Sequence, residues 1–198
     1  ELGIGVISSK GLIEGPFARG KGSFIVSGRR TYIDALTRPI ILALNNGSGG
    51  GYYFYDLNAK ANYEINDKNK VYLSGYFGRD KFYANIKESF DNQSYKSDIN
   101  FGWGNATGTA RWNHVVNPKL FSNTSFIYSF YELAIKAEEE ENDQQLFSLK
   151  YGSGIEDYSI KQDFDWYANN KHKVKFGVLA THHTFTPDAL VIKDAVFG

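Results

Sequence analysis

Apolar and polar side chains alternate with a period of two along much of this chain. Between Tyr53 and Ile65 every odd-numbered position is apolar or aromatic, whereas the even positions from Asp56 to Glu64 are polar or charged. Residues 173–181 largely repeat this alternation. Alternation places the two sets on opposite faces of a β-strand, whereas a helix would spread the charges around its cylinder. The pattern therefore predicts strands with one apolar and one polar face.

Short clusters of turn-forming residues interrupt these strands at nearly even spacing. Gly, Pro, Asn and Asp, which tight turns favour, concentrate at residues 15–22, 66–70, 117–119 and 169–172. Longer polar stretches separate the turns, at roughly residues 31–51, 80–96, 136–145 and 184–198. We therefore expect one domain over residues 1–198, with hairpins at roughly 1–30, 52–80, 97–134 and 146–183 and long loops between them.

Some segments fit this pattern less well. Residues 2–14 and 120–133 do not alternate cleanly. Within residues 146–166 the apolar parity switches near Gly152 and Gly154, which indicates either a β-bulge or a strand that extends above a membrane.

Composition favours a membrane-embedded sheet over a soluble one. The chain has 14 Tyr, 15 Phe and 3 Trp among 198 residues, and these rings are scattered among Asn, Ser, Lys and Asp. Such mixing is expected where alternate side chains face lipid and water, and short turns that alternate with long loops are typical of transmembrane barrels. No apolar run approaches the roughly 20 residues of a membrane helix. We therefore predict an all-β fold, a transmembrane antiparallel β-barrel of the outer membrane, to which this chain contributes about eight strands.

Aromatic residues flank every short turn. The ones that best mark a rim are Phe24, Tyr63, Trp112, Trp166 and Phe176. Amphipathic rings are stable at the level of the lipid headgroups, so this repetition predicts an aromatic girdle at one rim of the barrel. The alternative is that aromatic residues are simply good strand formers.

Charge and cysteine content exclude several classes of function. Twenty-two basic residues balance 22 acidic ones, so no net field would attract nucleic acid. The chain has no Cys, and therefore no disulfide or thiol site, and we expect no cofactor. It also has no Met and opens without a signal peptide, so we expect a fragment of a longer protein.

Three segments resemble TonB-dependent outer-membrane receptors. The first runs from Glu14 to Tyr32, where a glycine-rich turn is followed by a strand that ends in Arg29-Arg30 and Thr-Tyr. The second comprises residues 55–60 and 72–80, and the third Trp112-Asn-His with residues 117–121. Together they extend the resemblance over about residues 1 to 180.

The resemblance implies a barrel of about 22 strands with a plugged lumen, of which this chain would form the N-terminal third. It also implies partners: outer-membrane lipid, the plug domain of the same protein, the TonB complex through an N-terminal part that this chain lacks, and in some receptors a surface lipoprotein. The implied work is active import of a bulky nutrient. The ligand class stays open among siderophore, cobalamin, glycan and peptide.

Charged residues on the polar strand faces are the candidate functional set. They are Arg29, Asp56, Lys60, Asp157, Lys161, Asp163 and Asp165. A face this charged does not suit a soluble core, because buried charges are costly unless paired, but it suits a wet or plugged lumen. These groups can pair across strands or hold a plug through charge-assisted bonds. Arg30 is the neighbour of Arg29, so only one of the two can face inward on a regular strand.

Other suggestive clusters have simpler explanations. The acidic run Glu138–Glu141 with Asp143 suggests Ca²⁺, but it lacks the spacing of a dedicated loop, so we expect a solvated loop tip. His182 and His183 would point to opposite faces of a strand and so are poorly placed to share a metal ion. Gly47–Gly51 lacks the Lys-Ser/Thr of a phosphate loop.

We therefore expect a section of the wall of a TonB-dependent importer, which performs no bond chemistry. One alternative is a complete eight-stranded barrel with a structural or adhesion role, whose last strand would pair with its first. Another is a barrel enzyme, but no Ser-His-Asp order or paired carboxylates in an apolar cleft mark a catalytic group.

Overall fold

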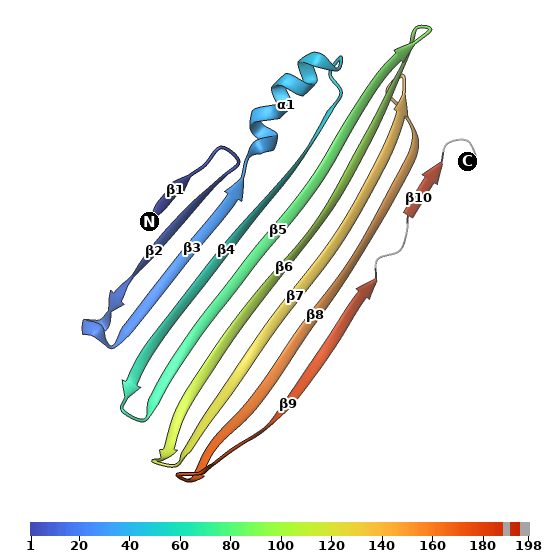
Figure 1. Ribbon diagram of the computed structural model, residues 1–198. Helices are drawn as coiled ribbons and strands as arrows, with labels where there is room; N and C mark the ends of the chain where they lie inside the picture. Colours follow the sequence, from blue (N-terminus) through green and yellow to red (C-terminus); the bar gives the residue numbers. More distant parts are fainter. Residues whose placement is uncertain (188–190, 195–198) are drawn as a thin grey trace.

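The computed structural model describes residues 1–187 and 191–194, which form one antiparallel sheet and a helix (Figure 1). The strands are β1 (Leu2–Ile4), β2 (Ser8–Phe17), β3 (Gly22–Thr31), β4 (Gly49–Asn66), β5 (Asn69–Phe90), β6 (Gln93–Asn117), β7 (Leu120–Glu141), β8 (Gln144–Asn169), β9 (His172–Pro187) and β10 (Val191–Asp194). A single 3₁₀ turn, η1 (Ala18–Gly20), joins β2 to β3, and the helix α1 (Ile33–Leu44) joins β3 to β4.

Each strand from β1 to β8 pairs with the next one along the chain, so the sheet is a simple meander (Figure 1). Both β9 and β10 pair with the same edge of β8, β9 along residues 153–169 and β10 along residues 147–150. They therefore behave as one interrupted edge strand. Within the described residues, β1 does not pair with β9 or β10, so the sheet is open.

The register confirms the predicted two-faced sheet. Residues directly opposite each other share a face, and one row from β4 to β9 is apolar throughout. It consists of Ala61, Leu73, Ala110, Phe126, Ile160 and Ala180. The adjacent row on the other face is polar but for one residue, with Lys60, Ser74, Thr109, Ile127, Ser159 and Thr181.

The apolar residues lie on the surface instead of in a core. No apolar side chain among the described residues is buried, and Leu73 and Phe126 are 58% and 59% exposed. A soluble sheet would cover such a face with a second layer. Within the same residues, no helix is long and apolar enough to cross a membrane.

Three of the short turns repeat the same local structure. Asn66, Asn117 and Asn169 each end a strand, and their side-chain oxygens accept a hydrogen bond from the backbone N–H of the Lys two residues later, at 3.0, 2.9 and 2.9 Å. A register shift precedes each of these Asn residues. The sequence Asn-X-Lys is therefore a turn signal with a physical cause, since an Asn side chain mimics the backbone of a turn.

The opposite end of the sheet differs from the prediction. Two of the expected long loops, at residues 80–96 and 136–145, are continuations of β5 to β8 that meet in two-residue turns. Both residues of each turn, Asp91-Asn92 and Asn142-Asp143, have positive φ, as tight hairpins of this kind require. The acidic run Glu138–Glu141 therefore lies in β7 and not at a loop tip.

The remaining expectations for this end have mixed outcomes. The stretch 31–51, expected as a loop, contains α1. In the stretch 184–198, β9 continues to Pro187, and residues 188–190 and 195–198 lie outside the described part. Gly152 and Gly154 pair regularly with Ala134 and Glu132, so the parity switch near them is not a bulge.

Candidate functional site: the polar face of the barrel wall

All seven predicted lumen residues lie on the polar face of the sheet. On β3 and β4, Arg29 and Asp56 lie directly opposite each other and so share this face, and Lys60 lies on it four residues further along β4. On β8 the residues Asp157 to Asp165 alternate with the apolar row, so the four charged positions share that face. The structure does not bring all seven together: they form one group on β3–β4 and another on β8.

In the β8 group, Lys161, Asp163 and Asp165 lie toward the short turn at residues 169–172, Asp157 lies further from it along the strand, and the group extends onto β9. Lys161 Nζ is 2.9 Å from Asp163 Oδ2, and Asp165 Oδ1 is 3.1 Å from Lys173 Nζ and 3.2 Å from Lys175 Nζ. Together with Arg111 and Asn123, members of this group line a hollow of about 540 Å³. The hollow is therefore bordered by both signs of charge, and its donors and acceptors can meet a polar surface laid against it.

The β3–β4 group centres on one short ion pair. Arg29 Nη2 is 2.7 Å from Asp56 Oδ2, and Arg29 Nε donates to the same oxygen at 2.9 Å. Arg30 points to the other face, where its guanidinium lies 5.5 Å from the centre of the Tyr53 ring. Lys60 takes part in no ion pair within the described residues.

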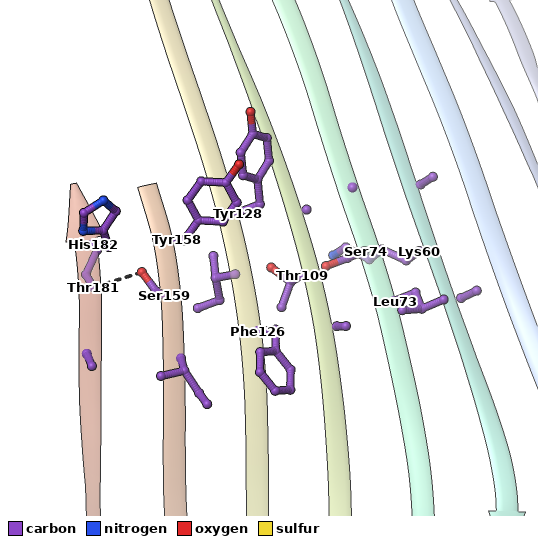
Figure 2. Close-up of a pocket in the computed structure, with 18 of the residues that line it drawn as sticks. Lys60, Leu73, Ser74, Thr109, Phe126, Tyr128, Tyr158, Ser159, Thr181 and His182 are labelled. Atoms are coloured by element: carbon purple, nitrogen blue, oxygen red, sulfur yellow. Dashed lines mark hydrogen bonds between the residues drawn. The ribbon is translucent and has the colours of Figure 1, made fainter. Parts of the chain in front are cut away.

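The two neighbouring histidines lie on opposite faces. His183 Nδ1 is 2.7 Å from Asp157 Oδ1 on the polar face, whereas His182 lines a groove on the apolar face (Figure 2). In the part of the chain that the structure describes, no group of three or more His, Asp or Glu side chains could hold a metal ion.

Sequence reasoning missed an aromatic cluster on the polar face, about midway along β6 and beyond the charged residues. Phe101 and Trp103 have ring centres 5.1 Å apart, Tyr52 stacks 6.5 Å from Trp103, and Phe82 pairs directly with Phe101. The hydroxyl of Tyr52 donates to Asp80.

The polar face is thus charged from the short turns up to the Arg29–Asp56 pair, and the rings of the cluster begin in the next row, where Arg29 lies 4.8 Å from the centre of the Phe54 ring. The available signal for the cluster was the change of parity near Gly152, where the apolar residues of β8 move from odd to even positions and so change face. The apolar and aromatic residues of β4 to β6 change face in the same way.

The apolar face carries the five predicted girdle residues. Phe24, Tyr63, Trp112, Trp166 and Phe176 all fall on this face and near short turns. The Phe164 and Phe176 rings stack at 5.1 Å, and Trp112 Nε1 donates to Asn69 Oδ1 at 2.9 Å. That these rings sit at lipid headgroups remains a prediction.

A broad groove of about 890 Å³ crosses this apolar face between Leu73 and Phe126 and reaches β9 (Figure 2). Its floor is smooth because small residues occupy it, with Ala59, Ala61, Gly75, Gly108 and Ala110. Tyr128 and Tyr158 lie side by side at its margin, with ring centres 5.1 Å apart, and both hydroxyls donate to Glu156 Oε1. The face thus presents apolar atoms with few polar groups, which suits contact with lipid chains.

Solved structures share this fold. The chain aligns with the ferric yersiniabactin uptake receptor FyuA from Yersinia pestis with a TM-score of 0.53 and 9% identity, over 90% of this chain and 33% of that one. It aligns with the ferric citrate transporter FecA, in the unliganded form, with a TM-score of 0.50 and 7% identity, over 96% of this chain and 31% of that one. No protein-family model and no curated protein matches the sequence. The chain spans about a third of the length of these two structures, and the likeness shows its fold, the antiparallel wall of an outer-membrane β-barrel.

Proposed function

We propose that this chain is a section of the barrel wall of a TonB-dependent transporter that imports a bulky nutrient across the outer membrane. The observation that carries the proposal is an open, two-faced sheet: one face is apolar without a covering layer, and the other is lined with charges and rings. A face of the second kind suits a wide lumen, since small barrels fill their interiors with packed side chains.

The paired charges on the polar face support contact with a plug. The pairs Lys161–Asp163 and Lys175–Asp165 border a hollow, and their side chains remain partly exposed. Groups of both signs can exchange partners when a plug domain lies against them, at low cost. In this proposal the plug and the TonB-binding segment belong to the same longer protein, and a surface lipoprotein is an optional further partner.

The aromatic cluster supports passage of a ligand. Tyr52, Phe101 and Trp103 offer ring faces beyond the charged residues, on the side away from the short turns, which is the outward side in barrels of this class. Ring faces bind apolar or planar parts of ligands without requiring one exact hydrogen-bond pattern. The cluster does not select among siderophore, cobalamin, glycan and peptide.

The alternative function is that of a complete eight-stranded barrel with a structural or adhesion role. Such a barrel needs its first and last strands to pair. The open sheet of the described residues favours the larger barrel instead, as does the partial coverage of FyuA and FecA.

Ion conductance distinguishes the two. The whole protein that carries this chain is purified, inserted into a planar bilayer, and its conductance is recorded in buffer and then in urea that unfolds a plug domain but not a barrel. A plugged transporter is expected to conduct little in buffer and to open large, stable channels in urea. A filled eight-stranded barrel would stay nearly silent in both solutions, and that result would contradict the proposal.

A further inference from the structure

Helix α1 has apolar residues on two sides. On the sheet side Asp34 is buried, Arg38 lies over the Tyr83 ring at 5.6 Å, and Ile41 and Leu42 lie beside Gly49. A stripe at helical spacing turns away from the protein and comprises Ile33, Leu36, Ile40 and Leu44, which are 39%, 54%, 61% and 77% exposed. A helix on the surface of a soluble protein has polar residues in place of this second stripe. The exposed stripe therefore requires an apolar environment outside the chain.

The helix packs on the lipid side of the wall and not on the lumen side. A Cβ added to Gly51 would lie 2.8 Å from Asp34 Cβ, and one added to Gly49 would lie 3.0 Å from Leu42 Cδ2. Both glycines share the face of Tyr53 and Leu57, which is the apolar face. The hydroxyl of Tyr83, on the same face of β5, donates to Asp34 Oδ2 at 3.3 Å. The lumen, and hence a plug or a passing ligand, is on the other side of the sheet.

The helix also lies at the height of a membrane surface. A tilted strand crosses the hydrocarbon layer in about ten residues. Counting that far from Tyr63 along β4 leads to Tyr53, and from Trp112 along β6 to Gly102. These two positions lie in one row, joined through Lys81 of β5. Tyr63 and Trp112 themselves share a row through Val71, so they define one lower level of the lipid layer and one upper level, at the row of Tyr53. The contacts of α1 with β4 begin at this upper level, at Gly51.

The charged residues at this level of the sheet favour contact with lipid headgroups. The apolar face gains cations at this row and just below it, with Arg30 over the Tyr53 ring and with Lys81 on β5. Basic residues beside tyrosines are typical anchors at the membrane surface, where phosphates are within reach. The acids near this level are already engaged, Asp34 with Tyr83 and Glu132 with Arg79.

We propose that α1 is an interfacial helix that inserts the stripe Ile33, Leu36, Ile40 and Leu44 among the lipid chains of the outer leaflet. The helix runs on from β3 alongside β4 and extends the apolar wall of the barrel at its upper rim (Figure 1). The occupant of the stripe is lipid, because the stripe continues the lipid-facing surface. This role depends on the barrel fold and not on the import of a ligand.

This chain has no cysteine, and any cysteine elsewhere in the whole protein is first replaced by serine. In the whole protein, single nitroxide labels are attached at Leu36→Cys and Ile40→Cys, and the protein is folded into vesicles of phosphatidylethanolamine and phosphatidylglycerol. Collision rates with oxygen, which concentrates in lipid, and with a polar nickel chelate, which stays in water, are measured by electron paramagnetic resonance. Leu73→Cys on the apolar face and Asp143→Cys in a turn are the lipid and water controls.

Labels at Leu36 and Ile40 are expected to collide more with oxygen than with nickel, as the label at Leu73 does, and the label at Asp143 is expected to show the reverse. A water-like ratio at both helix positions would overturn the proposal. Shielding from both reagents would also overturn it, because that result means that a protein surface, such as a second copy or a partner, covers the stripe. Both residues are exposed, so their replacement is not expected to prevent folding.

Discussion

Arg79 of β5 and Glu132 of β7 form an ion pair at 3.0 Å across the strand that separates them. The residue between them on β6 is Gly104, and a Cβ there would lie 3.6 Å from Arg79 Cγ. The missing side chain leaves a path along which the guanidinium reaches the second strand. The pair lies just below the row where the lipid layer is inferred to end, so it joins three strands where apolar residues give way to charges.

The coupling between Arg79 and Glu132 should be small and should depend on Gly104. Both side chains are about two-fifths exposed, and exposed pairs contribute about 1 kcal/mol or less. A double-mutant cycle with Arg79→Gln and Glu132→Gln, measured by urea unfolding of the whole protein in vesicles, should give a coupling within that limit. Repeating the cycle in a Gly104→Leu background should abolish it. A coupling that survives Gly104→Leu would show that the guanidinium does not need this path.

A second glycine, Gly22, should be intolerant of any side chain. The Phe17 and Tyr63 rings stack at 6.1 Å on either side of it, and a Cβ on Gly22 would lie 2.8 Å from the backbone oxygen of Asn62. Because a backbone atom cannot move aside cheaply, Gly22→Ala should lower the free energy of unfolding by about 1–3 kcal/mol.

Gly108→Ala is the matched control for Gly22→Ala. A Cβ at Gly108 meets nothing within 4 Å, and it lies in a strand on the same face. This substitution should be neutral or stabilising by up to about 1 kcal/mol, because Ala loses less backbone entropy on folding than Gly. Equal losses for the two variants would mean that crowding at Gly22 is not the cause.

The sequence predicted the short-turn half of the sheet because its signals there are local. Asn66, Asn117 and Asn169 cap their own turns through their own side chains. Between the turns, lipid on one face and water on the other impose a strict period of two. The alternation of odd and even positions also placed the seven charged residues on one face of the sheet, as in the structure. It did not predict the partners of these residues. The lysines of Asp165, for example, come from the next strand, β9.

The other half was missed because its structure depends on pairing. Residues such as Glu88 and Ser97 are polar although they belong to strands, since both faces of β5 and β6 meet water beyond the membrane. Without a lipid face the alternation disappears, and a paired strand then looks like a loop in the sequence. Helix α1 was missed for another reason: the Asn, Gly and Ser residues of 45–51 are typical of a loop, and the whole stretch 31–51 was therefore expected to be one, although Ile33, Leu36, Ile40 and Leu44 have helical spacing.

The three tryptophans of this chain should report the two faces directly. Trp112 and Trp166 lie on the apolar face, and Trp103 lies on the polar face, where its ring packs against Phe101. Lipids with brominated chains quench only rings that contact them. Trp112→Phe and Trp166→Phe should each reduce the part of the emission that these lipids quench, whereas Trp103→Phe should leave it unchanged. Quenching lost with Trp103→Phe would mean that the faces are assigned the wrong way round.

The hairpin tips beyond the membrane should separate in acid. Asp143, in the turn after β7, pairs with Lys96 of β6, and so links two hairpins. The hydrogen bond and the positive charge of Lys96 lower the pKa of Asp143 below its usual 3.8, while the hydrogen bond to Asp143 raises the pKa of Lys96 above 10.5. The carboxylate's contribution is therefore complete above its unfolded pKa and is lost as pH falls through the lower, folded value. The lysine's contribution is complete below 10.5 and is lost only as pH rises past its folded pKa.

Hydrogen exchange at residues 141–145, corrected for the intrinsic effect of pH, would measure this link. Protection should be constant through neutral pH and should fall in strong acid, below pH 3.8, as Asp143 takes up its proton. Lys96→Gln should remove most of this pH dependence, because Asp143 loses its ion pair and Glu140 loses its contact with Lys96 at 3.9 Å as well. The same acid-induced loss in Lys96→Gln would show instead that protonation of the acidic run, and not the pair with Lys96, opens the tips.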